Sequence, residues 1–273
     1  MKEIESAETI NVEIKSFQNA NVFIKCVTKF EYLTSILKEK NFKARYVEED
    51  VRYLNLTFSG TEITSITFPM ICFCDIPINK LKEHIDWYGR YAICLKKEWG
   101  INSAKLSPIH YLNSESNLVN RYSKYLNNIL NNENSSNDEL LYILDQIFYY
   151  KPYKGKQFYA ANKQIKPKLF MDEQEWRYVY LPEKESEEKK INAFYINGND
   201  DSLKSDYNEV IEKDINNSLT FKLDDIRYIV IPNIKEKERL IKFIDDHLEF
   251  NQIEKYQIVS KILVMEEIEE DFI

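Results

Sequence analysis

Glycine and histidine are scarce in this chain, and their scarcity excludes several kinds of active site. The 273 residues include five glycines and three histidines. Neither GxGxxG nor GxxxxGK(S/T) occurs, so there is no glycine-rich loop whose backbone N–H groups could cradle a phosphate. GxSxG and HExxH are absent too. Three widely spaced histidines also leave a Ser-His-Asp or Cys-His mechanism little to work with.

Cysteine is limited to Cys26, Cys72, Cys74 and Cys94, all within apolar, strand-like runs. This usage is typical of a reduced, cytoplasmic protein with small buried thiols. No CxxC or histidine cluster completes the Cys72-x-Cys74 pair, so we expect no metal site. No run of about 18 apolar residues is present, and residues 1–15 lack the apolar core of a signal peptide. We therefore expect no membrane association.

Basic residues are outnumbered by acidic ones, which gives a net charge of −8 and a pI near 5.2. Such a charge argues against extended binding to nucleic acid or to anionic membranes. The segment 151–168, KPYKGKQFYAANKQIKPK, is the exception because it holds six lysines and three aromatic residues. One interpretation is a local contact with single-stranded nucleic acid. The other is an irregular, solvated loop.

Hydrophobic residues make up 44% of the chain and aromatic residues 14%, which is typical of a globular fold. The first half predicts a strand at 21–28, a helix at 29–42 with Leu33, Ile36 and Leu37 as its apolar stripe, and a strand pair around Pro69. Asp75 is placed to cap a helix that Gly89 ends, and a strand follows at 90–100.

The second half predicts two helices within 116–150, the second capped by Ser136 or Asn137, and then the loop at 151–168. A strand follows at 171–182. Residues 225–266 predict a β-α-β unit, and we expect the acidic tail after it to be solvated. Together these patterns predict a single α+β domain over 1–273, with a mixed sheet of short strands surrounded by helices.

The stretch MDEQEWRYVYLP (171–182) places two charged residues in an otherwise apolar strand. Side chains alternate along a strand, so Glu175, Arg177 and Val179 share one face, and Trp176, Tyr178 and Tyr180 share the other. A buried unpaired carboxylate would cost several kcal/mol. Glu175 and Arg177 are therefore either a structural ion pair or the floor of a site.

Other polar groups that could complete a site project from apolar segments. The run Arg45-Tyr46-x-Glu48-Glu49 follows the first helix. His84 and Tyr88 lie four residues apart on one helix face, and Tyr91 opens the next strand. Each also has a structural interpretation, as a surface pair or a core residue. A carboxylate with Tyr and Arg helpers suits a reaction with an oxocarbenium-like transition state.

Three blocks in this order resemble the abortive phage infection protein family AbiGi: FEYLTSILKEKNFKARYVEED, PMICFCDIPINKLKEHIDWYGRYAICLKKEWGI and DEQEWRYV. The resemblance includes KPY at 151–153 and covers about 22–182. It implies a component of an abortive-infection, toxin–antitoxin type of anti-phage system, with an antitoxin role and a nucleotidyltransferase-like toxin as partner.

The layout is more remotely similar to ADP-ribosyltransferase-like folds. That resemblance implies an NAD cofactor, with Glu175 as the late-strand carboxylate and Tyr88 or Tyr91 at the middle position. Cys26 stands where a histidine is expected, so anchoring of NAD would move to Arg45 or Lys25. The implied catalytic residues are Glu175, Tyr88 and Arg45, and the implied cofactor-binding residues are Arg177, Tyr46, Tyr91, His84 and Lys25.

Two hypotheses from different classes therefore stand side by side. The first is a defence enzyme that cleaves NAD or transfers ADP-ribose to a target. The second is a catalytically inactive antitoxin or sensor that binds a toxin or a phage component.

Overall fold

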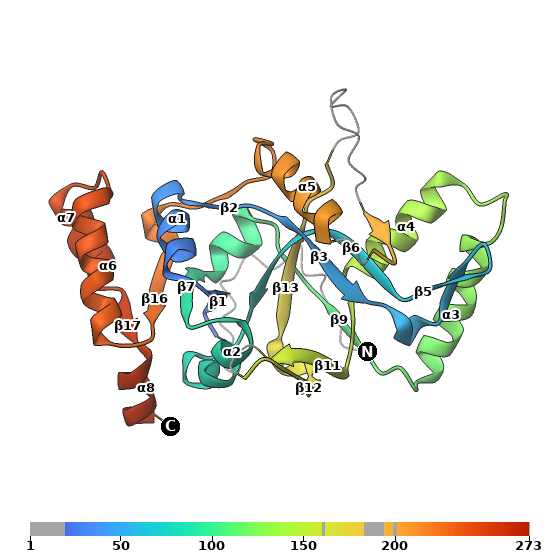
Figure 1. Cartoon of the computed structure of the whole chain (residues 1–273), viewed down its shortest axis with the longest axis horizontal. Helices are drawn as coiled ribbons and strands as arrows, with labels where there is room; N and C mark the ends of the chain where they lie inside the picture. Colours follow the sequence, from blue (N-terminus) through green and yellow to red (C-terminus); the bar gives the residue numbers. More distant parts are fainter. Residues whose placement is uncertain (1–19, 160–161, 183–193, 199–200, 273) are drawn as a thin grey trace, which may run out of the picture.

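The computed structural model describes residues 20–159, 162–182, 194–198 and 201–272. The expectation for residues 1–15 lies outside this part of the chain. At the centre of the described residues is a mixed sheet of nine strands (Figure 1). Its main path runs β17-β16-β7-β1-β6-β13-β8, and β3 and β14 also pair with β6. The strands are β1 Val22–Val27, β3 Arg45–Asp50, β6 Ser65–Cys74, β7 Tyr91–Lys96, β8 Ser107–Pro108, β13 Glu175–Val179, β14 Tyr195–Ile196, β16 Ile226–Ile231 and β17 Ile262–Val264.

Helices cover the two ends of this sheet, with α3 and α4 at one end and α6, α7 and α8 at the other (Figure 1). The helices are α1 Phe30–Glu39, α2 Leu81–Tyr88, α3 Asn117–Leu130, α4 Asn137–Phe148, α5 Asp201–Glu212, α6 Ile234–His247, α7 Gln252–Val259 and α8 Met265–Phe272. Four two-stranded sheets are also present in the described part of the chain: β2 Asn41–Phe42 with β15 Leu219–Thr220, β4 Leu56–Phe58 with β5 Thr61–Ile63, β9 His110–Leu112 with β10 Tyr150–Pro152, and β11 Lys154–Tyr159 with β12 Gln164–Leu169.

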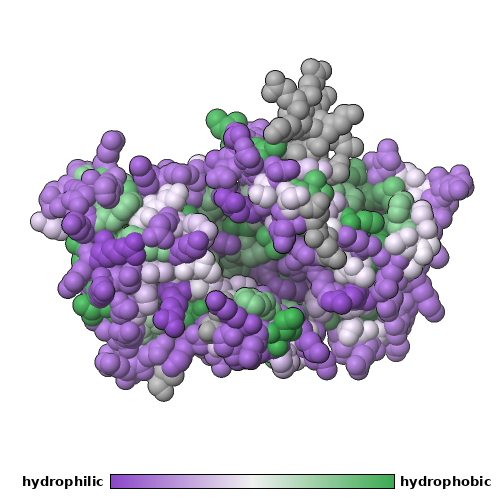
Figure 2. Space-filling model, in the orientation of Figure 1, coloured by the Kyte–Doolittle hydropathy of each residue, from purple (hydrophilic) through white to green (hydrophobic). Residues whose placement is uncertain are grey.

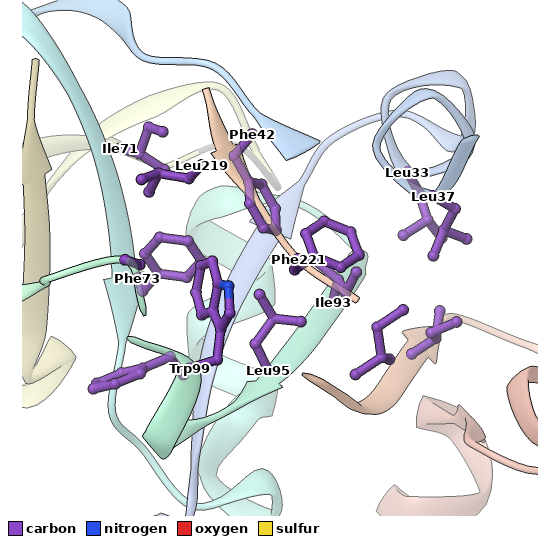
Figure 3. Packing of buried hydrophobic residues seen from close by; sticks show 14 of the residues in the cluster. Leu33, Leu37, Phe42, Ile71, Phe73, Ile93, Leu95, Trp99, Leu219 and Phe221 are labelled. Carbon is purple, nitrogen blue, oxygen red and sulfur yellow. The ribbon is translucent and has the colours of Figure 1, made fainter. Parts of the chain in front are cut away.

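Alternation along β6 separates the hydrophobic core into clusters. Ile71 and Phe73 belong to the largest cluster, while Met70 and Cys74 belong to two others. In the largest cluster Phe73 packs on Phe42, with ring centroids 5.3 Å apart, and other aromatic rings gather around them (Figure 3). The same alternation puts Trp176 and Tyr178 against the largest cluster and Val179 against another, as predicted for β13.

Much of the predicted secondary structure is confirmed. The first strand is β1, and α1 buries Leu33 and Leu37. Ser136 caps α4, because its hydroxyl accepts a hydrogen bond from the backbone N–H of Glu139 at 3.2 Å. The C-terminal β-α-β unit is present, with β16 and β17 parallel and connected through α6 and α7. The fold is α+β, as expected.

The strand pair expected around Pro69 is wrong, because β6 runs through the proline as one strand of ten residues. The Pro69 carbonyl accepts a hydrogen bond from Tyr180 N at 3.0 Å, so the missing N–H faces the same side. On that side β13 has already ended at Val179. The missing N–H therefore falls at the end of the β6–β13 ladder and does not interrupt the pairing of β6 with β3 on the other side.

Asp75 does not cap the helix that follows it. A short 3-10 turn, Ile78–Lys80, precedes α2, and no side-chain cap is present at either start. Asp75 is buried and instead accepts a hydrogen bond from Lys97 Nζ at 2.6 Å. Gly89 does end α2, because its N–H donates to the Ile85 carbonyl.

Two further expectations are corrected by pairing or packing. The predicted strand at 90–100 ends at Lys96, and a helical turn follows at Trp99–Ser103, where the Trp99 indole donates to the Thr220 carbonyl. The segment 151–168 is not an irregular loop, because Lys154–Tyr159 and Gln164–Leu169 pair as an antiparallel hairpin. The acidic tail forms α8 and is largely solvated as expected, because Glu266, Glu267, Glu270 and Asp271 are exposed, while Glu269 pairs with Lys82 of α2.

Candidate functional site

The sheet splits along one edge of β6, and a cavity lies at the split. β3 pairs with β6 from Ser65 to Met70, whereas β1 meets the same strand at Cys74 alone. The cavity has a volume of about 270 Å³, and Figure 2 shows a recess on this face of the molecule. Its walls come from β1, β3, β6, α2 and the β11–β12 hairpin, and its lining includes Lys25, Cys26, Val47, Glu48, Glu49, Cys72, Cys74, His84, Tyr88, Lys151, Gln157, Glu173 and Glu175.

Glu175 lies at the floor of the cavity between two cations. Its Oε1 accepts from Arg177 Nε at 2.5 Å, and its Oε2 accepts from Lys151 Nζ at 2.7 Å. Its backbone N–H donates to the Tyr111 hydroxyl at 2.8 Å. Glu175 is 5% exposed and Arg177 is fully buried. The structure therefore confirms that the two share one face, as a buried ion pair.

A second carboxylate extends this cluster toward α2. Glu173 Oε2 accepts from Lys151 Nζ at 3.0 Å, and its Oε1 lies 2.6 Å from Lys168 Nζ. The Tyr88 hydroxyl donates to the same carboxylate, and it also contacts Gln157 at 3.1 Å and Lys168 at 3.0 Å. Lys151 is thus held by both carboxylates at once.

Arg177 continues the cluster toward β3 and α4. Its Nη1 donates to the Phe148 carbonyl at 2.8 Å. Its Nη2 lies 3.1 Å from Glu49 Oε1, a distance typical of an ion pair, without the alignment of a hydrogen bond. The cluster of Glu49, Glu173, Glu175, Lys151, Lys168 and Arg177 therefore contains three carboxylates and three cations. We call it the charge cluster.

The charge cluster sets the protonation of its members. Burial alone would raise the pKa of the Glu175 carboxyl, but the charges of Arg177 and Lys151 outweigh burial and hold this pKa well below its usual range. The pKa of Glu173 is lowered in the same way, mainly by Lys151 against burial. Both carboxylates are ionised at neutral pH and fully engaged with cations.

His84 and Tyr88 form the α2 wall of the cavity, with ring centroids 4.6 Å apart. Burial lowers the pKa of His84 to about 4, so its imidazole is neutral at pH 7. Burial also raises the pKa of Tyr88 well above its usual value, so its hydroxyl keeps its proton. This wall carries no charge of its own.

A family model described as "Putative abortive phage resistance protein AbiGi, antitoxin" matches residues 40–232. The chain belongs to the AbiGi family. A Lactococcus lactis subsp. cremoris relative, named abortive phage resistance protein AbiGi, is 35% identical over 256 residues, which are 85% of this chain and 99% of the relative. No solved structure matches. The AbiGi resemblance is thus confirmed, and it reaches further toward the C-terminus than the sequence blocks indicated.

The structure brings together five of the eight residues that the resemblances singled out in this AbiGi-family chain. Glu175, Tyr88, His84 and Lys25 line the cavity, and Arg177 lies directly behind Glu175. The pairing of His84 and Tyr88 on one helix face is confirmed.

Arg45, Tyr46 and Tyr91 lie outside the cavity lining. Arg45 is exposed and pairs with Glu212 of α5 at 3.3 Å. Tyr46 is buried in the core, where its ring packs on other tyrosines. The Tyr91 hydroxyl contacts Glu236 of α6 at 3.1 Å. Alternation along β3 explains the position of Tyr46, because its side chain faces the core while the side chains of Arg45 and Val47 point to the opposite side.

Sequence reasoning missed Lys151, Lys168, Glu173 and Gln157. One local signal was available, because Glu173 and Glu175 flank a single residue in the block DEQEWRYV. The cations come from a segment interpreted as a loop, and their partners lie 22 and 24 positions away for Lys151. Lys168 and Gln157 come from the β11–β12 hairpin, whereas Lys151 comes from β10 and Glu173 from the turn after β12, so only the folded arrangement brings these side chains together.

Cys26 occupies the cavity wall as a protonated thiol, because burial raises its pKa to about 12. All four cysteines are free. Within the described ranges, no group of three His, Cys, Asp or Glu side chains is arranged to hold a metal ion. No helix in the same part of the chain is long and apolar enough to cross a membrane.

Proposed function

We propose that this AbiGi-family chain acts as the antitoxin of an abortive-infection system, and that it restrains a cognate toxin by binding rather than by catalysis. The antitoxin description of the family supports the role. The observation that carries the non-catalytic part is the pairing of Glu175, which has Arg177 Nε at 2.5 Å and Lys151 Nζ at 2.7 Å.

Electrostatics explains why this pairing argues against an ADP-ribosyltransferase-like reaction. A carboxylate assists an oxocarbenium-like transition state through the attraction of its negative charge. Two cations in direct contact with Glu175 cancel most of that attraction at any point in the cavity. The complete charge cluster has no net charge, so the cavity floor offers a developing cation little stabilisation.

Cys26 adds an independent argument. An imidazole at its position could hydrogen-bond a ribose or an amide, whereas a protonated thiol is only a weak donor. Loss of one such contact typically costs about 1–3 kcal/mol. The paired Glu175 and the thiol of Cys26 would therefore each weaken the binding of a nucleotide without changing the fold.

Co-expression with the product of the adjacent gene tests the proposal. We expect the adjacent gene alone to stop growth, this chain alone to be harmless, and the two together to restore growth. Purified chain and toxin should also form a stable complex without added NAD. Toxicity of this chain alone, or rescue that needs NAD, would refute restraint by binding.

A second candidate function rests on the cavity itself. Glu175, Tyr88, His84 and Lys25 converge on it from three parts of the chain, which supports a site for part of an NAD molecule. At about 270 Å³ it is just below the roughly 300–1,000 Å³ typical of small-molecule pockets. Labelled NAD, incubated with the wild type and with Glu175→Gln, tests this candidate. If the wild type releases or transfers the label and Glu175→Gln does not, the result would favour this second candidate over the antitoxin proposal.

A further inference from the structure

The β11–β12 hairpin presents two different faces. Its inner face is fixed to α2, because the Tyr159 hydroxyl donates to Asp86 at 3.0 Å and Gln157 contacts Tyr88. Lys168 packs over the ring of Trp87 at 4.3 Å as well as pairing with Glu173. These contacts hold the hairpin against α2 (Figure 1) and leave its outer face free of the cavity.

The outer face combines exposed apolar and basic side chains. Phe158 and Ile165 are directly opposite each other across the two strands and are 55% and 72% exposed. Lys154 is opposite Leu169, and Lys156 is opposite Pro167. In Figure 2, hydrophobic atoms lie among hydrophilic ones where Figure 1 draws this hairpin. We call Lys154, Lys156, Phe158, Ile165, Pro167 and Leu169 the hairpin face.

Such large exposed fractions of Phe158 and Ile165 are unusual for a surface that contacts water alone. A Phe or Ile side chain gains about 1.5–3 kcal/mol when it is fully buried. Cross-strand apolar pairs normally cover one another or face a core. Met171 follows the hairpin and is 51% exposed, so the apolar area continues beyond β12.

Charge indicates what kind of partner fits. Residues 151–171 contain six lysines and no acidic residue, and removing those six from the net charge of −8 leaves the remaining chain at −14. Lys154 and Lys156 form no ion pair within the described ranges, unlike Lys151 and Lys168. The hairpin is therefore a basic surface on an acidic molecule, and electrostatic complementarity favours an acidic partner.

A protein fits this face better than a nucleic acid does. Ile165, Leu169 and Met171 are aliphatic and offer no stacking platform for bases, and Phe158 is one ring among them. The strongly acidic remainder of the chain would repel an extended polyanion. A protein surface can supply carboxylates and an apolar side chain together.

We infer that the hairpin face is the docking surface for an acidic protein segment, with an apolar side chain of that segment packed between Phe158 and Ile165 and its carboxylates on Lys154 and Lys156. This inference rests on the proposed antitoxin function, and it makes the acidic segment part of the toxin. The inner face of the hairpin stays committed to the charge cluster, so docking requires no change in the cavity.

Two variants and two matched controls test the inference. Lys154→Glu/Lys156→Glu reverses the basic part, and Ile165→Ser removes half of the apolar pair. The controls are Lys235→Glu/Lys242→Glu on α6, with the same change in charge, and Ile253→Ser on α7, where Ile253 is 69% exposed. Thermal melting of all four should match the wild type, because these side chains are exposed.

The measurement is the Kd for the purified product of the adjacent gene at low and at high salt. We expect each hairpin variant to weaken binding at least tenfold and each control to change it less than about twofold. The wild type should bind more weakly at high salt, and the charge reversal should remove most of that dependence. A wild type that does not bind at all refutes the antitoxin function, and the docking assignment with it.

Two outcomes would overturn the docking surface while leaving the antitoxin function intact. One is wild-type affinity for the toxin in both hairpin variants. The other is tight binding of a labelled 12-nucleotide single strand at physiological salt, lost in Lys154→Glu/Lys156→Glu while toxin binding is unchanged. The second outcome would reassign the hairpin face to nucleic acid.

Discussion

Replacement of Glu175 by glutamine should destabilise the fold, because this carboxylate balances two buried cations. The substitution preserves shape and removes one negative charge. Arg177 would keep the Phe148 carbonyl at 2.8 Å and Glu49 at 3.1 Å, and Lys151 would keep Glu173 at 3.0 Å. The charge cluster would change from balanced to a net charge of +1 in a buried location.

The magnitude follows from the cost of leaving a buried charge without its partner. Removal of one member of a buried ion pair costs about 3–5 kcal/mol. Because Arg177 and Lys151 each retain another acceptor, we expect the lower end, about 3 kcal/mol. At roughly 2–4 °C per kcal/mol for a chain of this size, the melting temperature should fall by about 6–12 °C.

Urea unfolding and thermal melting measure this effect, with Glu48→Gln as the matched control. Glu48 also lines the cavity, on β3, but it is exposed and should change stability by less than about 0.5 kcal/mol. In Glu175→Gln/Lys151→Gln the cluster is balanced again, so the double variant should lose less than the two single losses combined. A Glu175→Gln protein as stable as the wild type would show that this carboxylate is not structural.

Three further perturbations test other parts of the structure. The pKa of His84 is about 4 in the folded chain and 6.5 in the unfolded chain, so the free energy of unfolding should fall by up to about 3 kcal/mol as the pH drops from 6.5 toward 4. Urea unfolding at several pH values measures this fall, and an equal fall in His84→Gln would refute the role of His84. Gly89→Ala should lower the free energy of unfolding by at least about 2 kcal/mol, because φ at this position is +123° and the new Cβ would lie 2.4 Å from the Val27 carbonyl oxygen. A loss below about 1 kcal/mol in urea unfolding would contradict this prediction. Ser136→Ala should cost about 1 kcal/mol through the lost α4 cap, and no change in melting temperature would count against the cap.

Local patterns were sufficient for much of the fold, and they failed where distant segments decide the outcome. Alternation over five residues was enough to predict that Glu175 and Arg177 share a face. Pro69 was interpreted as a break because its surroundings are invisible in a short window, yet its missing N–H points to the side where β13 has ended. Asp75 was assigned to the helix it precedes, but Lys97, 22 residues later, binds it.

In the candidate site, too, local patterns predicted some residues and distant segments supplied the rest. Glu175 and Arg177 lie two residues apart in one strand, so the sequence was enough to place them together. The other cations are Lys151 in β10 and Lys168 in the hairpin, and the sequence shows their charges without any indication of which lysines would be buried. Lys151 reaches Glu173 across 22 residues, whereas Lys168 lies five residues before it, and no period in the sequence specifies either contact.

The alternation of the hairpin explains how one lysine-rich segment can serve two purposes. In β12, Lys168 points inward and completes the charge cluster, whereas in β11 Lys154 and Lys156 point outward into solvent. A substitution on the outer face therefore leaves the inner ion pairs untouched, while loss of Lys168 would disturb both the cavity and the position of the hairpin. For this reason, loss of toxin binding in the outer-face variants can be assigned to docking, and loss of binding in Glu175→Gln cannot.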